Sequence, residues 1–425
     1  MHQSSEAAVL KFFSLGGLLF LLCHALAFAQ SAERLSLKEA IEIAIQHNPE
    51  IVGTRRGVDA AQARFWRGIA PPPASLSVSY DYIPSGSGIN DYGERSIGVS
   101  QSFDFPTTIV LRGSSLSSET DAAEADFHST SLSITMQVKL AYYGVLSEQE
   151  KLKLAEENLS IADDFAQKAD VRYNVGEGTN LERLTAKVQR TQAQNAVEVA
   201  RNELRLATGE LNLALGRGKE HMRQEFTLTD SLVYRSYALL LESLVEQAHQ
   251  SNPRLQSARF RLNAASVNRT IAWSSILPSL TMSYYRQVQG NNPDLYGVSF
   301  GISLPIWFLL DQRGQVQEAA ATYAKLESDL LSKGNFISLD VKNAYLDFTN
   351  DERQVQLYDA DLLPQADEVY RTAATSYQAG EITYLEFLQA RQTLISARTT
   401  YIDALYHYNI ALARLENAVG RTISE

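Results

Sequence analysis

The chain is almost free of cysteine. Among its 425 residues the single cysteine is Cys23, and that residue lies in an N-terminal stretch typical of a secretory signal peptide. Lys11 precedes an apolar run over residues 12–22, and Ala27-Phe28-Ala29 supplies a small-residue cleavage site. We therefore expect residues 1–29 to be removed and the rest of the chain to be exported. Without Cys23 the exported chain can form no disulfide, thiol nucleophile or thiolate metal site.

Positive charge and long apolar runs are also scarce. Lys and Arg number 38 against 49 Asp and Glu, a formal net charge of -11, which argues against a nucleic-acid-binding protein. After residue 29 there is no apolar run of about twenty residues, the length that a transmembrane helix needs. An exported protein of this kind could be periplasmic, secreted or a membrane β-barrel. Leu22 is too bulky for the residue before a lipoprotein cysteine, so we expect no lipid modification at Cys23.

Motifs for catalysis and metal binding are missing as well. The sequence contains no Gly-x-Ser-x-Gly nucleophile motif and no His-x-x-x-His pair. The five histidines after the signal peptide are scattered along the chain: His47, His128, His221, His249 and His407. We expect a protein that is not an enzyme, with no catalytic residue, no cofactor and no metal site.

What the chain does contain is a duplication that covers most of its length. Asn-Pro occurs at 48–49 and again at 252–253, an offset of 204 (252 minus 48). Ala-Tyr recurs from 141–142 to 344–345 at an offset of 203. Such a sustained offset indicates an internal repeat with one insertion or deletion. We predict a first structural repeat at 30–217, a linker at 218–238 and a second structural repeat at 239–425.

Alternating patterns in each repeat predict four β-strands. Apolar residues alternate with serine, glycine and other small or polar residues, so that each strand has one apolar and one small polar face. Strands of about nine residues with this pattern are typical of membrane barrels. The predicted strands cover residues 74–82, 96–103, 279–288 and 296–304, paired across loops at 83–95 and 289–295.

Long helical segments follow the strands. They run from about 109 to 173 and from about 312 to 377, and at 1.5 Å per residue each could reach about 90–100 Å. Pro364 should kink or break the second segment. Each segment ends in a stretch where glycine stops one helix and threonine starts the next, which returns along it. In the final return helix, apolar residues step by three and four, the spacing of a coiled-coil seam: Leu394, Ala397, Tyr401, Leu405, Tyr408, Leu412, Leu415 and Val419. We interpret the two glycine–threonine stretches, at about 174–180 and 378–383, as tips of helical hairpins and as the working end of the protein.

The four predicted strands are too few to close a barrel, for which about eight are needed. An open sheet edge in lipid would leave backbone groups unpaired at high cost, so the chain must share a barrel with copies of itself. Two copies would supply eight strands and three would supply twelve. We favour three, because a face rich in serine and glycine suits a water-filled lumen. The predicted fold class is α+β, with a trimeric twelve-stranded barrel continued by long helical hairpins.

These elements, in this order, resemble the TolC family of outer-membrane efflux proteins. The resemblance rests on the doubled opening segment that ends in Asn-Pro, on the strand pairs and on the Tyr-x-x-Gly tips, and it covers essentially the whole exported chain. It implies a homotrimer embedded in outer-membrane lipid and extending into the periplasm as a helical barrel. It also implies two partners, a periplasmic adaptor (membrane fusion) protein and an inner-membrane RND-type pump.

Two stretches resemble more narrowly the heavy-metal, CzcC-like subgroup of that family. They are residues 304–307 with 311–314, and residues 380–394 with 401–405. The resemblance therefore implies a passive conduit for heavy-metal cations. Drug efflux and type I protein secretion are the alternatives within the family, whose members share the architecture. A periplasmic coiled-coil scaffold without a pore is the alternative of another class.

The resemblance also assigns roles to residues at the tips. Glu182, Tyr377 and Glu386 match periplasmic gate positions, and Gln389 stands where the family has a second acid. Tyr377 is expected to hydrogen-bond to the neighbouring hairpin, at Glu182. The alternative for the glutamates is an ordinary first-turn position favoured by the helix dipole. Adaptor docking is assigned to turn residues that also fit a plain hairpin turn: Val175, Gly176, Ala379 and Gly380.

Overall fold

The computed structural model describes residues 33–218, 226–290, 292–303 and 311–423. The predicted signal peptide lies outside these residues, as do the first CzcC-like stretch at 304–307 and part of the predicted linker. The described chain forms two compact units, and each unit combines segments of both repeats. Unit 1 holds residues 33–44, 137–235 and 353–410, and unit 2 holds residues 45–136, 236–352 and 411–423.

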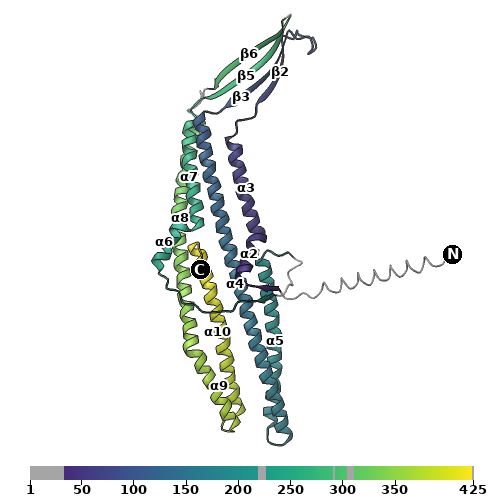
Figure 1. Cartoon of the computed structure of the whole chain (residues 1–425), viewed down its shortest axis with the longest axis vertical. Helices are drawn as coiled ribbons and strands as arrows, with labels where there is room; N and C mark the ends of the chain where they lie inside the picture. The colour runs from purple at the N-terminus through teal and green to yellow at the C-terminus, as the bar shows by residue number, and fades with distance from the viewer. Residues whose placement is uncertain (1–32, 219–225, 291, 304–310, 424–425) are drawn as a thin grey trace, which may run out of the picture. The chain divides into compact units, whose positions relative to one another are not determined.

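Unit 2 contains a four-stranded antiparallel sheet in the order β2-β3-β5-β6 (Figure 1). Its strands are β2 (Ser75–Asp81), β3 (Glu94–Phe103), β5 (Ser279–Gln289) and β6 (Asn292–Ser303). The strands β3 and β5, which come from different repeats, pair directly with each other. A period-two pattern predicts a strand but not its partner, so this central pairing was not foreseen.

The predicted loop at 289–295 is wrong. Strand β5 continues to Gln289, strand β6 begins at Asn292, and these two residues pair with each other. The connection is therefore much shorter than the sequence pattern suggested. Gly290 makes this possible because its φ of +52° lies in the left-handed region, which glycine enters without a steric penalty.

The register of the sheet separates an apolar face from a serine face. One row of mutually paired residues across the four strands is apolar and exposed: Leu76, Val99, Tyr284 and Val298. The adjacent row, on the opposite face, consists of serine alone: Ser75, Ser100, Ser283 and Ser299. Because successive residues of a strand point to opposite faces, the predicted alternation becomes a sheet with two chemically different sides.

The Asn-Pro pairs separate two helices in each repeat, as predicted. They stand between α2 (Leu37–His47) and α3 (Pro49–Ile69), and between α6 (Leu241–Ser251) and α7 (Pro253–Ser274). Asn48 accepts a hydrogen bond from Glu50 N and Asn252 accepts one from Arg254 N, both at 2.9 Å. Proline then fills the first helical position, where its missing N–H has no helical partner to lose.

The two long helical segments differ by one residue. In the first repeat α4 (Pro106–Asn174) is unbroken. In the second repeat α8 (Asp311–Leu357) leads into a single π-helical turn, η2 (Tyr358–Leu362), and then into α9 (Leu363–Gln378). Tyr142 and Gly176 are 34 residues apart (176 minus 142), whereas Tyr345 and Gly380 are 35 apart (380 minus 345). The π-turn holds this extra residue, and the break predicted at Pro364 takes that form.

The π-turn keeps the same side of the helix buried before and after it. Val355, before the turn, is 1% exposed. Leu363 and Tyr370, eight and fifteen residues later, pack on a buried cluster of α9 and α10. An unbroken helix would instead bring Leu362 and Val369 to that side at seven-residue steps, but these two are 36% and 49% exposed. The extra residue is therefore absorbed without turning α9 away from its partners.

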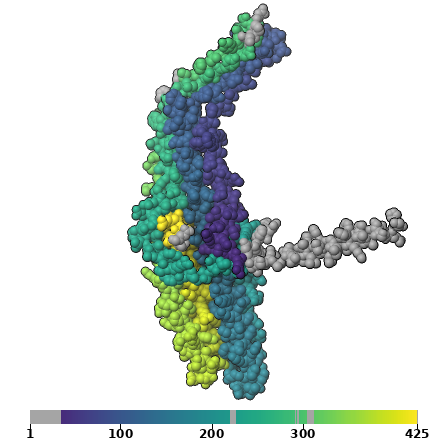
Figure 2. All heavy atoms as spheres, in the orientation of Figure 1, coloured from purple at the N-terminus to yellow at the C-terminus, as the bar shows by residue number. Residues whose placement is uncertain are grey.

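Unit 1 consists mainly of two helical hairpins, whose ends lie side by side (Figures 1 and 2). The first joins α4 to α5 (Asn180–Ala214), and the second joins α9 to α10 (Tyr384–Val419). Arg190 of α5 bonds to Asp163 of α4 at 2.5 Å, and Lys151 of α4 pairs with Asp403 of α10 at 2.8 Å. These contacts join α5 to α4 and α4 to α10, and α10 follows α9 across the second turn.

A short parallel strand pair also belongs to unit 1. Strand β1 (Glu33–Leu35) pairs with β4 (Phe226–Leu228), which lies in the predicted linker. Tyr142 of α4 fixes this pair, since its hydroxyl donates to Leu35 O at 2.9 Å and to Asp230 Oδ2 at 2.7 Å. Strands of three residues are too short to show a periodic pattern, so the sequence could not predict them.

Candidate functional site

The two hairpin turns share one glycine geometry. Gly176 has φ +81° and Gly380 has φ +78°, a conformation that other L-residues adopt only with strain. In each turn the residue after glycine donates its backbone N–H back to the preceding helix, which satisfies a free terminal carbonyl. The bonds are Glu177 N to Arg172 O and Glu381 N to Ser376 O, both at 2.9 Å.

The four predicted docking residues all lie in these turns, and all four are exposed: Val175, Gly176, Ala379 and Gly380. Val175 leaves 64% of its surface open to solvent. An exposed apolar side chain beside a bare glycine backbone is a surface that another protein can contact closely.

Both hairpins begin their second helix with Thr-x-x-Glu, but the two glutamates have different partners. Thr179 Oγ1 accepts the N–H of Glu182 at 3.1 Å, and Thr383 Oγ1 accepts that of Glu386 at 3.4 Å. The carboxylate of Glu386 turns back and accepts the N–H of Thr383 at 2.7 Å and its hydroxyl at 2.8 Å. This closed capping box lowers the pKa of Glu386, chiefly through the N–H of Thr383.

Glu182 is the tip glutamate whose carboxylate reaches the other hairpin. Its Oε1 accepts a hydrogen bond from Tyr377 Oη at 2.7 Å and lies 3.2 Å from Arg172 Nη1. Arg172 Nη1 also donates to Tyr377 Oη at 3.3 Å, which completes a three-residue network. Burial, reinforced by the Glu182 carboxylate, raises the pKa of Tyr377 to about 12. The expected hydrogen bond between Tyr377 and Glu182 is present, and it joins α9 to α5.

The structure thus brings two of the four predicted gate residues into contact within one chain. Glu386 is bound instead at its own helix start, the local role that the sequence offered as the alternative. Gln389 lies one turn further along α10 and is exposed to solvent. Glu182 and Tyr377 are therefore the centre of the candidate site, and Arg172 is a member that the sequence did not identify.

Aromatic rings surround this contact, and most of them were also missed. They come from both hairpins: Phe165, Tyr370, Tyr377, Tyr384 and Phe387. The sequence did carry part of the signal, because tyrosine recurs at steps of seven from 370 to 384 across the second turn. Phe165 belongs to the other repeat, and no local pattern could pair it with those rings.

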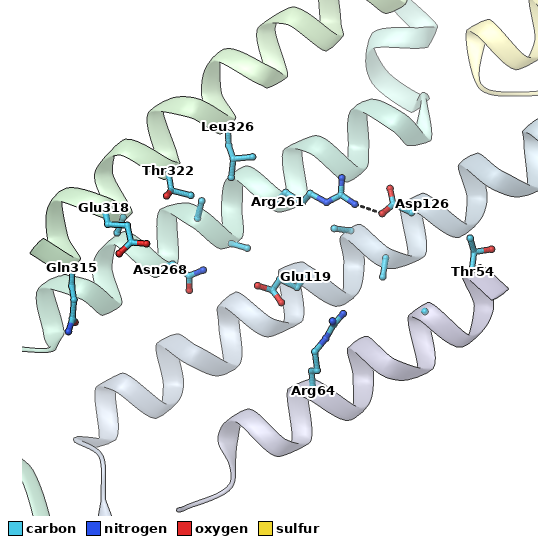
Figure 3. Close-up of a pocket in the computed structure, with 16 residues that line it drawn as sticks. Thr54, Arg64, Glu119, Asp126, Arg261, Asn268, Gln315, Glu318, Thr322 and Leu326 are labelled. Atoms are coloured by element: carbon cyan, nitrogen blue, oxygen red, sulfur yellow. Dashed lines mark hydrogen bonds and ion pairs between the residues drawn. The ribbon is translucent and has the colours of Figure 1, made fainter. Parts of the chain in front are cut away.

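A cavity of about 760 Å³ lies in unit 2 between α3, α4, α7 and α8 (Figure 3). Its polar side chains carry both signs of charge. Arg261 of α7 forms an ion pair with Asp126 of α4, and Arg64 and Glu119 project into the same space from α3 and α4. Such a mixed lining suits a hydrated surface rather than a site for one charged ligand.

Within the ranges that the structure describes, no three or more His, Cys, Asp or Glu side chains gather as a metal site would require. No helix of the described chain has the length and apolarity needed to cross a membrane.

Comparison with known proteins agrees with the repeat and the fold. The model of the family described as outer membrane efflux protein matches the chain twice, at residues 40–217 and 244–421. The two matches lie 204 residues apart (244 minus 40), which equals the offset between the Asn-Pro pairs. Each repeat is therefore related to the same family model.

Individual relatives and a solved structure are also similar to this chain. The chain is 23% identical over 290 residues to the cobalt-zinc-cadmium resistance protein CzcC of Cupriavidus metallidurans, covering 68% of each protein. It is 21% identical over 413 residues to the outer membrane protein TolC of Vibrio cholerae, covering 92% of this chain and 91% of TolC. It superposes on the open state of the MtrE outer membrane channel of Neisseria gonorrhoeae with a TM-score of 0.73 at 18% identity, covering 91% of this chain and 89% of MtrE.

The fold is therefore TolC-like, α+β, with a strand sheet and paired helical hairpins. The location follows from the family: the protein resides in the outer membrane and extends into the periplasm. The two family matches together cover far more than half of the chain, and they show that it belongs to the outer membrane efflux protein family.

Proposed function

We propose that the protein is the channel component of a tripartite efflux system, a passive conduit from an inner-membrane RND-type pump and a periplasmic adaptor to the outside. The observation that carries this proposal is the four-stranded sheet, with one apolar face, one serine face and two edge strands, β2 and β6. Unpaired strand edges are costly in lipid, so β2 of one copy pairs with β6 of the next. Three copies supply twelve strands, and their serine faces line a wet pore.

The edge helices of unit 1 support the same trimer. Helix α5 and the part of the second hairpin formed by η2 and α9 each carry apolar side chains that the described residues leave exposed. Exposed apolar residues along α5 are Leu181, Leu184, Val188, Val199, Leu206 and Leu213. On the second hairpin the exposed apolar residues are Leu362 of η2 and Val369 of α9. A contact between these two different edges, repeated three times, closes a ring.

At the hairpin ends we assign the periplasmic gate to the contact between Glu182 and Tyr377. In a trimer this contact occurs three times around the axis and ties each second hairpin to the first. Glu386 and Gln389 belong to the same gate as exposed polar groups of α10 near the pore entrance, where a ring of carboxylates favours cations. The exposed turns at 175–176 and 379–380 are the surface that docks on the adaptor.

Heavy-metal cations are the substrate class that we propose. Support comes from the likeness to a cobalt-zinc-cadmium resistance protein and from the stretch at 380–394, which resembles the CzcC-like subgroup. Drug efflux and type I protein secretion are the alternatives. A strain that lacks the gene should lose tolerance to cobalt, zinc or cadmium and regain it on complementation. Loss of tolerance to drugs alone, or of a secreted protein, would favour one of the alternatives.

Planar-bilayer recording of the purified full-length protein tests the channel itself. We expect stepwise conductance from a trimer that dissociates on heating. The double variant Glu182→Gln with Tyr377→Phe should raise single-channel conductance, because it removes the polar tie between the hairpins. Glu177→Gln, the same change of charge at an exposed residue of the first turn, should leave the conductance as it was. A folded trimer that never conducts would favour the coiled-coil scaffold without a pore.

A further inference from the structure

The contact between the two hairpin ends is larger than the bond between Glu182 and Tyr377. Phe165 of α4 stacks on Phe387 with 4.7 Å between ring centroids, and it lies 6.0 Å from the rings of both Tyr377 and Tyr384. All three partners belong to the second hairpin. Phe387 is 1% exposed and stacks on Tyr377 at 5.3 Å. One side chain of the first hairpin therefore meets three rings of the second.

A reciprocal contact lies beside it. Tyr384 of the second hairpin packs on a cluster of buried alanines of the first hairpin: Ala166 and Ala169 of α4 and Ala186 of α5. Ala186 is 1% exposed, so the ring of Tyr384 closes over a floor made of small side chains. Larger residues at these positions would occupy the space of the ring. Each hairpin thus inserts one aromatic ring into the other.

The aromatic contacts outweigh the polar ones at this site. The hydroxyl of Tyr377 and the carboxylate of Glu182 form one hydrogen bond, and both groups can bond to water once they separate, which offsets much of its contribution to closure. An aromatic pair changes the equilibrium constant for closure by a factor of about two to ten, in addition to the effect of the apolar surface that it buries. Phe165 takes part in three such pairs. Removing its ring therefore weakens closure more than removing the hydroxyl of Tyr377.

We propose that Phe165 and Tyr384 form a hydrophobic latch that holds the hairpin ends together and positions Tyr377 for its bond to Glu182. This inference rests on the proposed function as a gated channel. In the closed arrangement each ring occupies a socket in the other hairpin, and opening requires both rings to leave. The hydrogen bond aligns the two ends, and the latch supplies most of the free energy that keeps them together.

Bilayer recording with the full-length trimer tests the latch. Phe165→Ala should raise the open fraction about tenfold or more, given three lost ring contacts, and should exceed the effect of Tyr377→Phe. Phe165→Leu keeps the apolar bulk and so guards against unfolding. Its open fraction should lie between those of the parent and of Phe165→Ala. Ala169→Leu removes no ring but fills the socket of Tyr384, and it should open the gate as well. Tyr173→Ala is the matched control, an aromatic residue of the first tip that packs under Arg183 and should not change the open fraction.

A distance measurement separates the latch from a general loss of stability. The exported chain has no cysteine outside the predicted signal peptide, so spin labels on Asn180→Cys and Gln378→Cys report the separation of the two ends without background. Phe165→Ala should lengthen this distance and leave the unfolding temperature of the trimer within a few degrees of the parent. An unchanged distance and an unchanged open fraction in both Phe165→Ala and Ala169→Leu would overturn the latch.

Different outcomes of these measurements distinguish the gate from the latch. If Tyr377→Phe raises the conductance and Phe165→Ala does not, the gate stands and the latch is wrong. If no variant of a folded trimer conducts, the channel function is wrong, and the spin-label distances alone decide whether Phe165 holds the hairpins together.

Discussion

Glu182 and Glu386 occupy equivalent places in the two repeats, 204 residues apart (386 minus 182), yet their carboxylates have different partners. The reason lies at the position that carries Arg172 in the first repeat and Ser376 in the second (376 minus 172 is also 204). The guanidinium of Arg172 draws Glu182 away from its own helix start, 3.2 Å from the carboxylate. Ser376 has no charge and bonds to Glu381, so Glu386 closes the capping box instead.

Exchanging this one residue should change the partner of Glu182. In Arg172→Ser we expect the Glu182 carboxylate to return to Thr179, as Glu386 returns to Thr383, and to weaken its tie to Tyr377. Because Arg172 is 46% exposed at its side chain, the ion pair is worth at most about 1 kcal/mol. Single-channel conductance should therefore rise, but less than in Glu182→Gln. A conductance equal to that of the parent would contradict this role for Arg172.

Closure should depend on alkaline pH through Tyr377. Its pKa is raised to about 12 by burial and by the contact with Glu182, against about 10 for a free tyrosine. The neutral phenol is therefore favoured by closure, and the stabilisation is fully present below about pH 10 and lost as the pH rises toward 12. We expect the open fraction to grow over this range in bilayer recordings. Tyr377→Phe has no group to titrate there and should give a flat profile.

At the scale of elements, the π-turn explains how one extra residue and a proline fit in a long helix. In an unbroken α-helix Pro364 would lack its hydrogen bond and would collide with the carbonyl four residues earlier. In the π-turn the N–H of Leu363 bonds to Tyr358 O, five residues back, and Pro364 falls in the first turn of α9. The side of α9 that carries Tyr370 and Tyr377 stays in line with Val355.

Deleting Ala360 should therefore destabilise the protein only while Pro364 is present. The deletion makes the helix regular and places proline in its interior, which lowers the free energy of unfolding by about 3 kcal/mol. We expect thermal unfolding, followed by circular dichroism, to occur at a lower temperature in the deletion variant. Adding Pro364→Ala to the deletion should restore the parent temperature, since the regular helix then has no clash. Failure of this rescue would show that the extra residue has a role beyond housing proline.

At the scale of the whole molecule, the two free edges of unit 1 predict how copies meet. The exposed apolar side of α5 has no partner within the described chain of one copy, and burial of such surface is worth about 25 cal/mol per Å². Together with the open edges of the four-stranded sheet, it supports the proposed contact between copies. In the proposed trimer the pore and the gate involve all copies, whereas the pair of Glu182 and Tyr377 and the rings of the proposed latch lie within one chain.

A charge on the apolar side of α5 should break the trimer. Leu206 is 64% exposed in the single chain, and Leu206→Lys would bury an unpaired ammonium between copies. We expect sedimentation of the detergent-solubilised protein to show monomers, and bilayer conductance to disappear. Arg205→Glu, a charge reversal about 100° further round the same helix, is the control and should remain trimeric. A trimeric Leu206→Lys would show that this side of α5 faces solvent.

Local signals account for what could be predicted. The four strands follow from alternation, the helix breaks from Asn-Pro, and the hairpin ends from Gly176 and Gly380, because each depends only on neighbouring residues. The seam of the final helix was equally visible: Leu405 and Leu415 of the predicted set are buried. The tight connection at Gly290 was not, because a strand and a short loop of the same composition look alike in sequence.

The sequence by itself determined the types of element, their order and the residues present at the hairpin ends, since periodicity and turn chemistry are local. The resemblance of those ends to a known family then singled out Glu182 and Tyr377. Only the tertiary structure decided that Arg172 joins the pair of Glu182 and Tyr377, and that Phe165 lies among three rings of the other hairpin. These contacts join residues about two hundred positions apart, and they depend on which helix packs on which, a relation that no local pattern encodes.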